Sequence, residues 1–275
     1  MAYDGDLPLL ADAFARAGVD HEVQPWDAPV DWSGYDGVVI RSTWDYTARR
    51  DEFLGWVDGV AATTRLANPP GVVRWNTDKR YLAELAAQGV PVVPTVWPRD
   101  GSTIPSHWDD IVVKPAVSAG GRFTGRFSGV ADATRFAEAL LAQGHDVLVQ
   151  QYVATVDAVG ERGVFFFGGE PSHAIRKGAI LERDAAPRAD ASLGQGQASE
   201  ALALADAPVA FARSVLDVIG EPLLYARVDC VTDDAGADRV IEVELVEPYL
   251  FLVTDPPAAD RFVAAVVAWL GTPIG

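Results

Sequence analysis

Three carboxylates stand at alternating positions on two neighbouring strands that the sequence predicts towards its C-terminal end. Asp229 lies in the segment 225–231, and Glu242 and Glu244 lie in the segment 239–246, beyond a turn rich in Asp and Gly. Alternate residues of a strand share one face, so the two glutamates point the same way and Asp229 faces them. Acids so close repel one another unless a cation binds among them, and without nearby His or Cys they favour Mg²⁺ or Mn²⁺ over zinc. The alternative is a solvated strand face with ordinary surface acids.

A glycine-rich loop follows a second predicted strand, at 111–115. Lys114 stands at the end of that strand, and Ser118, Gly120 and Gly121 follow it. Such a loop lets backbone amides approach phosphate oxygens while the ammonium group neutralises their charge. It is not a Walker loop, because no GK[ST] sequence opens a helix here. A plain β-hairpin, whose glycines only make the turn, explains the same residues equally well.

Basic residues are few in this chain, which makes their positions informative. Its 22 Lys and Arg against 39 Asp and Glu give a net charge of −17, which disfavours nucleic acid and anionic membranes as partners. The basic residues near the motifs above predict a local positive site suited to a polyphosphate: Lys79, Lys114, Arg176, Lys177 and Arg227. Taken singly, each is explained by a surface salt bridge. The segment 150–153 ends a strand and offers backbone groups to an adenine edge, or is simply a core strand.

The elements that position these residues begin with alternating helices and strands. Apolar periodicity predicts helices at 7–18, 53–66 and 78–88, and strands at 20–23 and 35–40. The last of these strands delivers the polar residues 41–43 as a loop, and the sequence 68–71 is a strong helix stop. This alternation favours an open α/β sheet, whose usual first strand we expect to be absent or truncated.

The second part of the chain mixes helix and strand with an antiparallel tendency, which is typical of an α+β fold. After a linker at 96–105, the remaining segments follow as strands at 111–115, 147–150, 163–167, 225–231 and 239–246, and helices at 131–143, 209–219 and 258–270. Residues 184–200 lack periodicity and are longer than an ordinary connection, so we expect a mobile loop or lid there.

The cysteine count and the lengths of the apolar segments argue against a disulfide-stabilised protein and against a membrane-spanning protein. Cys230 is the single cysteine, so the chain forms no internal disulfide, and its strand phase places it in the core. The apolar segment 262–270 is far shorter than the ~20 residues of a membrane helix. We therefore expect a cytoplasmic protein without a membrane partner.

The order of these motifs from about residue 75 to 250 resembles that of the ATP-grasp superfamily. The sequence also resembles a narrower glutathione-synthetase-like group, which includes the cyclo-ligase of D-cycloserine biosynthesis. Four strings carry this second resemblance: 41–46 (RSTWDY), 68–69 (NP), 74–82 (RWNTDKRYL) and 247–251 (EPYLF).

The resemblance implies a role for each part of the nucleotide site. Lys79, on a helix, and Lys114 would hold the α- and β-phosphates of ATP, under the loop that contains Ser118, Gly120 and Gly121. The adenine would lie against three consecutive residues, Gln151, Tyr152 and Val153, and Glu161 would reach the ribose.

It likewise implies the groups that surround the reaction. Arg176, Lys177 and Arg227 would steady the transferred phosphoryl group, and Asp229, Glu242 and Glu244 would bind two Mg²⁺ ions. Many members of the superfamily carry Asn where Glu244 stands, so this site has an extra negative charge. The substrate would face Arg41, Ser42, Thr43 and Asp45.

The implied architecture is an ATP-grasp fold preceded by an open α/β domain. Residues 1–70 would form the substrate-side domain, 71–110 a central linking part and 111–275 the nucleotide- and metal-binding domain, with 71–153 as the first ATP-grasp subdomain. The implied activity is that of an ATP-dependent carboxylate–amine ligase, which joins small-molecule acid and amine groups into an amide or a ring through an acyl phosphate. A small-molecule kinase and a non-catalytic nucleotide-binding module are the alternatives. Members of the group often dimerise, so a homodimer is the expected assembly.

Overall fold

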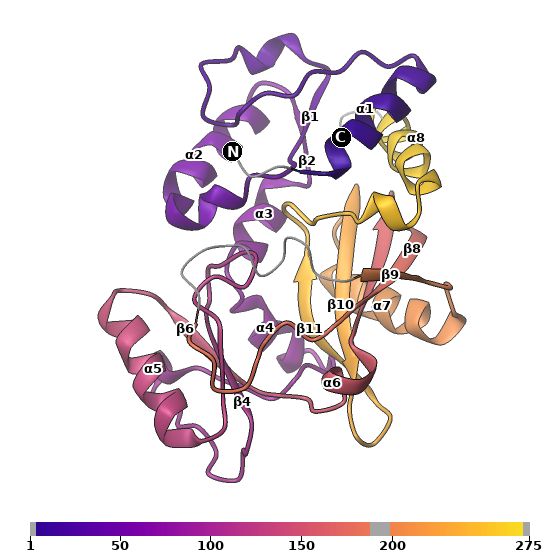
Figure 1. The fold of residues 1–275 in the computed structure, drawn as a ribbon. Helices are drawn as coiled ribbons and strands as arrows, with labels where there is room; N and C mark the ends of the chain where they lie inside the picture. The colour runs from indigo at the N-terminus through magenta and orange to yellow at the C-terminus, as the bar shows by residue number, and fades with distance from the viewer. Residues whose placement is uncertain (1–3, 188–198, 272–275) are drawn as a thin grey trace.

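The N-terminal part of the computed structural model, which describes residues 4–187 and 199–271, is a small α/β layer (Figure 1). Its strands β1 (Gly37–Val39) and β2 (Arg65–Ala67) form a parallel pair. Two helices accompany them, α1 (Asp6–Ala17) and α2 (Arg50–Ala61). The last helix of the chain, α8 (Pro257–Gly271), returns to this layer and packs beside α1.

A four-stranded antiparallel sheet forms the second part of the molecule. Its strands, in spatial order, are β3 (Thr95–Val96), β6 (Val147–Gln151), β4 (Ile111–Pro115) and β5 (Gly125–Phe127). The helix α5 (Val130–Ala142) buries its apolar face against this sheet, where Ala137 and Leu140 meet Ile111 and Val113. The glycine-rich loop joins β4 to β5, so it is the loop of a β-hairpin.

A five-stranded antiparallel sheet forms the third part. In spatial order its strands are β11 (Asp238–Glu244), β10 (Tyr225–Thr232), β7 (Glu161–Phe167), β8 (Glu170–Lys177) and β9 (Ser199–Leu202). The apolar run of β7 is buried on both faces. Val164 and Phe166 face the cluster that contains α4 (Tyr81–Ala87) and α7 (Asp206–Ile219), whereas Phe165 and Phe167 face the cluster that contains α8. A short helix, α6 (Val156–Val159), leads into β7.

Side chains satisfy part of the outer edge of β11, beside a short backbone bridge between Val92 and Val240. Asn76, at the end of helix α3 (Pro70–Asn76), donates to Val243 O at 2.8 Å and accepts from Leu245 N at 2.8 Å. The Tyr81 hydroxyl donates to Val243 O and accepts from Val243 N, both at 2.9 Å. Buried backbone groups require such partners. These two residues therefore fix the short segment between them against β11.

Two other side chains bind the N-terminal layer to the five-stranded sheet. Asn68 donates to Tyr225 O and Leu245 O, at 2.9 and 2.7 Å. The Tyr225 hydroxyl lies among the carbonyl oxygens of Ile40, Ala67 and Val246, at 2.8–3.2 Å. Both side chains are fully buried, so the two parts share one interior.

Several boundaries differ from the sequence predictions. Residues 20–23 form no strand, and the helix predicted at 53–66 ends at Ala61 because Leu66 belongs to β2. The sequence 68–71 is not only a helix stop as predicted, because α3 begins at Pro70. Proline is tolerated in the first turn of a helix, since a backbone N–H at that position would form no hydrogen bond within the helix.

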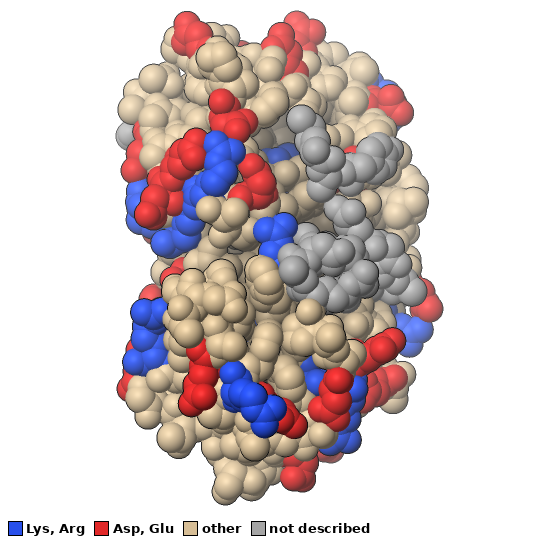
Figure 2. All heavy atoms as spheres, turned by 60° about the vertical axis from the view of Figure 1, so that its left-hand side comes forward, with Lys and Arg blue, Asp and Glu red and all other residues tan. Residues whose placement is uncertain are grey.

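The helix predicted at 78–88 begins at Tyr81, so Lys79 lies in a turn between α3 and α4 and not on a helix. Most of the predicted lid at 184–200, namely 188–198, lies outside the described residues. No helix in the described ranges is long and apolar enough to cross a membrane. On the face in Figure 2, acidic and basic side chains are interspersed rather than gathered into one surface of a single sign.

Candidate active site

A cavity of about 1320 Å³ lies between the two sheets and extends to the N-terminal layer. Of the predicted site residues, the following line it: Arg41, Ser42, Thr43, Asp45, Lys79, Lys114, Ser118, Gly120, Gly121, Gln151, Tyr152, Val153, Glu161, Lys177, Arg227, Asp229, Glu242 and Glu244. Arg176 does not line it. Neighbouring residues of a strand point to opposite faces, so Lys177 faces the cavity while Arg176 pairs with Glu200 at 2.7 Å near the surface. The prediction for Arg176 is therefore corrected.

The register of the five-stranded sheet brings the predicted acids together. Asp229 stands directly opposite Glu242, and Arg227 directly opposite Glu244. On its other side Asp229 faces Gly163, where an added Cβ would lie 2.9 Å from Asp229 Oδ1. A larger residue at position 163 would therefore have to displace the Asp229 carboxylate, a constraint that the sequence pattern does not indicate.

Each acid of this ladder already has a cationic partner. Asp229 accepts from Lys177 Nζ at 2.8 Å and from Arg227 Nη2 at 2.9 Å. Glu242 lies 3.1 Å from Lys79 Nζ, and Glu244 is bonded to Arg227. Burial favours the neutral acid, but the charges of Arg227 and Lys177 outweigh it and lower the pKa of Asp229. Burial likewise opposes the charge on Glu242, and Lys79 and Lys114 lower its pKa.

The pKa of Glu244 shifts in the opposite direction. Burial raises its pKa to about 7; Arg227 opposes this shift, and the negative charges of Asp229 and Glu242 add to it. A positive ion near the ladder would relieve that repulsion.

Hard oxygen donors of this kind suit Mg²⁺, but they form no ready cage. No group of three or more acidic, histidine or cysteine side chains in the described part of the chain is arranged to hold a metal. The side chains of Glu242 and Glu244 are 26% and 28% exposed, whereas Asp229 is held at 3% by its two partners. Lys177 or Arg227 has to release Asp229 before all three can share a cation. The donor set fits Mg²⁺ whose remaining ligands are water and phosphate.

The lysines and the glycine-rich loop form one end of the cavity. Lys79 Nζ donates to Ser118 O at 2.7 Å, which joins the turn after α3 to the loop. Gly120 and Gly121 have φ angles of 62° and 72°, a left-handed conformation that glycine adopts freely. Burial lowers the pKa of Lys114, and no carboxylate oxygen of a described residue lies within 4.0 Å of its Nζ. Its ammonium group therefore lines the cavity without a direct ion pair to any described residue, although the charge of Glu242 acts on it.

The segment predicted to bind adenine has one free backbone donor. The N–H of Gln151 donates to Pro94 O at 3.0 Å, and that of Tyr152 donates to Asp110 O at 2.9 Å. The N–H of Val153 has no partner among the described residues. The Tyr152 ring lies under the Arg126 guanidinium, at 3.5 Å. Val153 thus carries the donor that an adenine edge requires.

Glu161, predicted to reach the ribose, lines the same part of the cavity. Its carboxylate lies 3.2 Å from Lys177 Nζ, and its side chain is 21% exposed. It is therefore both accessible and already paired.

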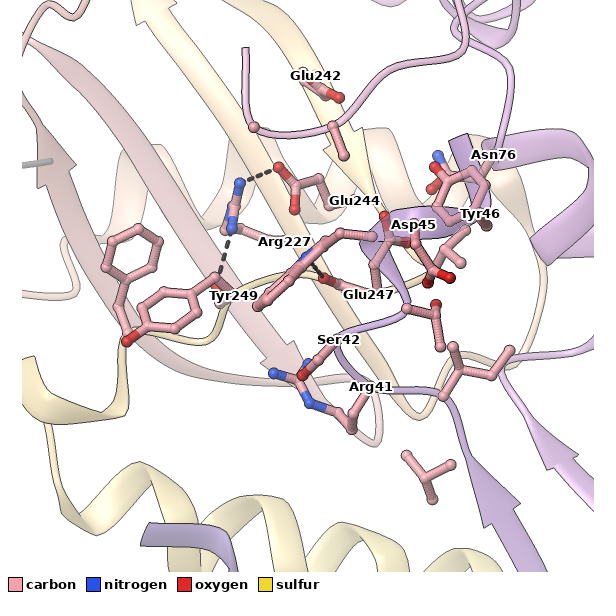
Figure 3. Close-up of a pocket in the computed structure, with 18 of the residues that line it drawn as sticks. Arg41, Ser42, Asp45, Tyr46, Asn76, Arg227, Glu242, Glu244, Glu247 and Tyr249 are labelled. Atoms are coloured by element: carbon pink, nitrogen blue, oxygen red, sulfur yellow. Dashed lines mark hydrogen bonds and ion pairs between the residues drawn. The ribbon is translucent and has the colours of Figure 1, made fainter. Parts of the chain in front are cut away.

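Polar residues of the N-terminal layer line the opposite end of the cavity (Figure 3). Arg41 Nη1 donates to Pro248 O at 2.6 Å, while its buried Nε and Nη2 have no hydrogen-bond partner among the described residues. Ser42 donates to Asp4, and Asp45 accepts from the Trp26 indole at 3.0 Å. The Thr43 hydroxyl is buried without a partner in the described part of the chain.

The segment after β11 contributes groups that the sequence reasoning left without a role. The Trp44 indole donates to Glu247 O at 3.1 Å, and Arg227 Nη1 donates to Tyr249 O at 2.9 Å (Figure 3). Glu247 itself is buried, which raises the pKa of its carboxyl to about 8. The string 247–251 carries the resemblance through this segment, but Glu247 is out of phase with the alternating acids Glu242 and Glu244, so the strand pattern does not mark its side chain.

Known proteins are similar to this chain over nearly its whole length. The profile of one family, described as "D-cycloserine synthetase DcsG, N-terminal domain", matches residues 1–68. The "Cycloserine biosynthesis protein DcsG" of Streptomyces lavendulae is 38% identical over 279 residues, which cover 96% of this chain and 93% of that protein.

Solved structures extend the agreement to the fold. The crystal structure of D-cycloserine synthetase DcsG is 36% identical and covers 97% of this chain and 95% of its own, with a TM-score of 0.85. An ATP-grasp ligase PsnB, complexed with a phosphomimetic precursor variant, Mg and ADP, gives 0.63 at 18% identity over 96% of this chain and 95% of that one. The D-alanine–D-alanine ligase of Bacillus anthracis, complexed with ATP, gives 0.63 at 13% identity over 98% and 94%. The chain therefore belongs to the DcsG family, has the predicted ATP-grasp fold and is an ATP-dependent ligase.

Proposed function

We propose that this ligase activates the carboxylate of a small amino-acid-like substrate as an acyl phosphate and joins it to an amine. In the first step a carboxylate oxygen attacks the γ-phosphorus of ATP, and ADP leaves. The amine nitrogen then attacks the acyl carbon, phosphate leaves, and a proton is released as the amide forms. If the amine belongs to the same molecule, a ring results. The relatives named for cycloserine biosynthesis favour the ring-closing form.

The main support for this proposal is that groups suited to a nucleotide and groups suited to a polar substrate line one cavity. Lys79, Lys114 and Val153 form an end that suits a nucleotide, and Arg41 and Ser42 form an end with polar groups of a different layer. The acid ladder and Arg227 lie on the same wall. Phosphoryl transfer depends mainly on positioning and on neutralising charge, and these groups supply both.

Each residue has a defined task in this reaction. Lys79 and Lys114 hold phosphate oxygens, and the Val153 N–H orients the base. Arg227 and Lys177 stabilise the negative charge of the transferred group and of the acyl phosphate. Asp229, Glu242 and Glu244 would hold Mg²⁺ or Mn²⁺, which would offset phosphate charge when bound.

The test is ADP and phosphate release with ATP and Mg²⁺ across a panel of amino acids and hydroxyamino-acid derivatives, followed by mass spectrometry of the product. The expected result is one ADP and one phosphate per amide or ring formed. A stable phosphorylated product without free phosphate would show a kinase instead. Thermal stabilisation by ATP and Mg²⁺ with no ADP formed from any mixture would show a binding module and refute the proposal.

A further inference from the structure

Glu247 is an acid of the cavity that forms no ion pair with any described residue. Its side chain lines the cavity and the residue is only 8% exposed. The neighbouring main chain is fixed from the N-terminal layer, because Trp44 donates to Glu247 O and Arg41 donates to Pro248 O. In Figure 3 Glu247 lies between Arg227 on one side and Asp45 and Tyr46 on the other.

The ion pairs around the acid ladder involve acids other than Glu247 in the described part of the chain. Each other buried or half-buried acid of the ladder region has a Lys or Arg partner: Glu161 with Lys177, Asp229 with Lys177 and Arg227, Glu242 with Lys79, and Glu244 with Arg227. No Lys, Arg or His nitrogen within residues 4–187 and 199–271 lies within 4.0 Å of the Glu247 carboxylate. Arg41, a cation of the N-terminal layer that lines the same cavity, lies 3.6 Å from both Asp4 and Asp6.

Burying an ionised carboxylate without a counter-charge costs free energy, and the raised pKa of Glu247 reflects this cost. Burial is the main cause of its high pKa, the negative charges of Glu244 and Glu242 add to it, and Lys79 and the Tyr46 hydroxyl act in the opposite direction. A positively charged ligand beside Glu247 would remove the penalty. A compact ammonium group fits such a place, since it carries three donors on one centre.

We propose that Glu247 binds the ammonium group of an amino-acid substrate and selects substrates that carry an amine beside the reacting carboxylate. The inference rests on the proposed function, since Arg227 would hold the carboxylate end. Arg227 and Glu247 line the same cavity, and Arg227 donates to Tyr249 O, two residues beyond Glu247, at 2.9 Å. In an amino acid the ammonium nitrogen is two bonds from the carboxyl carbon, so its two charged ends call for a cation and an acid on neighbouring parts of one wall.

The experiment compares two rings that differ only in the amine. D-cycloserine, which carries a primary amine, and the same isoxazolidinone ring without that amine are titrated into the protein with ADP and Mg²⁺ by calorimetry. Wild type is expected to bind the amine-bearing ring about 10- to 100-fold more tightly, the range of one charge-assisted contact. Glu247→Gln should bind both rings equally, with unchanged affinity for ADP.

Glu244→Gln is the matched control, because it removes the other cavity acid of raised pKa but one that already pairs with Arg227. It should weaken the binding of Mg²⁺ and ADP and retain the preference for the amine. Equal binding of both rings by wild type would overturn the inference and leave the ligase proposal intact. Weaker Mn²⁺ binding by Glu247→Gln, with the amine preference retained, would assign Glu247 to the metal and also overturn it. If ADP binds and neither ring does, the inference fails, and the ligase proposal is decided separately by the release of ADP and phosphate across the substrate panel.

Discussion

Tyr81→Phe isolates the contribution of one buried hydroxyl to both stability and the site. The hydroxyl serves both backbone groups of Val243, which lies between Glu242 and Glu244 on β11. Its removal leaves the buried Val243 N–H unpaired, whereas Val243 O keeps the hydrogen bond that Asn76 donates. At about 1–3 kcal/mol for one unsatisfied buried group, the free energy of unfolding should fall by about 1–3 kcal/mol.

The same substitution should also weaken the interaction with ATP. Tyr81 and Asn76 flank the turn that carries Lys79, so loosening one anchor lets Lys79 move relative to Glu242. We expect the apparent KM for ATP to rise several-fold, with a smaller change in the KM for the other substrate.

The measurement is urea unfolding followed by far-ultraviolet circular dichroism, together with ATP titrations of the steady-state rate. Tyr35→Phe is the control, since its hydroxyl bonds an exposed carboxylate, Glu22, at 2.6 Å. Surface changes of this kind usually alter stability by less than about 0.5 kcal/mol. If Tyr81→Phe unfolds at the same urea concentration as Tyr35→Phe, the claim that side chains secure the edge of β11 is refuted.

Four further predictions follow from the site and the core. Lys114→Ala should raise the KM for ATP about 10-fold and slow turnover, because Lys114 lines the cavity without a direct ion pair to any described residue; an unchanged KM in steady-state kinetics would remove it from the nucleotide site. Glu242→Gln should lower kcat at least about 100-fold while the melting temperature shifts by only a few degrees, because the acid is partly exposed; parallel losses of kcat and melting temperature would indicate an ordinary salt bridge. Burial lowers the pKa of His173 to about 4, so below about pH 6.5 the unfolded chain binds a proton that the folded chain does not. Stability measured by urea unfolding should therefore fall from pH 7 to 5.5 more steeply in wild type than in His173→Gln, and equal slopes would contradict the neutral buried imidazole. Cys230 is fully buried and its pKa is raised to about 11, so a thiol reagent should label it only in denaturant, and rapid labelling of the native protein would argue against the core position.

The acid ladder could be predicted because a strand has a period of two. Asp229, Glu242 and Glu244 alternate with apolar residues, and that pattern alone places them on one face. The same rule separates Arg176 from Lys177, and applying it to that pair would have removed Arg176 from the site. The glycine-rich loop was read as either a hairpin or a phosphate site, and the structure shows a hairpin whose loop lines the cavity.

The remaining features depend on contacts between distant parts of the chain. Asn76 and Tyr81 meet Val243 across more than 160 residues, and nothing local in the sequence marks them as the edge of a sheet. Lys79 occupies a turn for the same reason, since those two anchors set the ends of α3 and α4. That Glu247 lacks an ion-pair partner among the described residues can likewise be found only from the three-dimensional contacts of the neighbouring acids.

The interior shared by the N-terminal layer and the five-stranded sheet determines how the molecule can open. Asn68 and Tyr225 lock those two parts together through buried hydrogen bonds, so separating them would break the core. The four-stranded sheet is also part of a common interior, because Ala116 and Leu148 lie in one buried cluster with Tyr81 and Val164. Any opening that admits a nucleotide would therefore have to leave both sets of buried contacts intact.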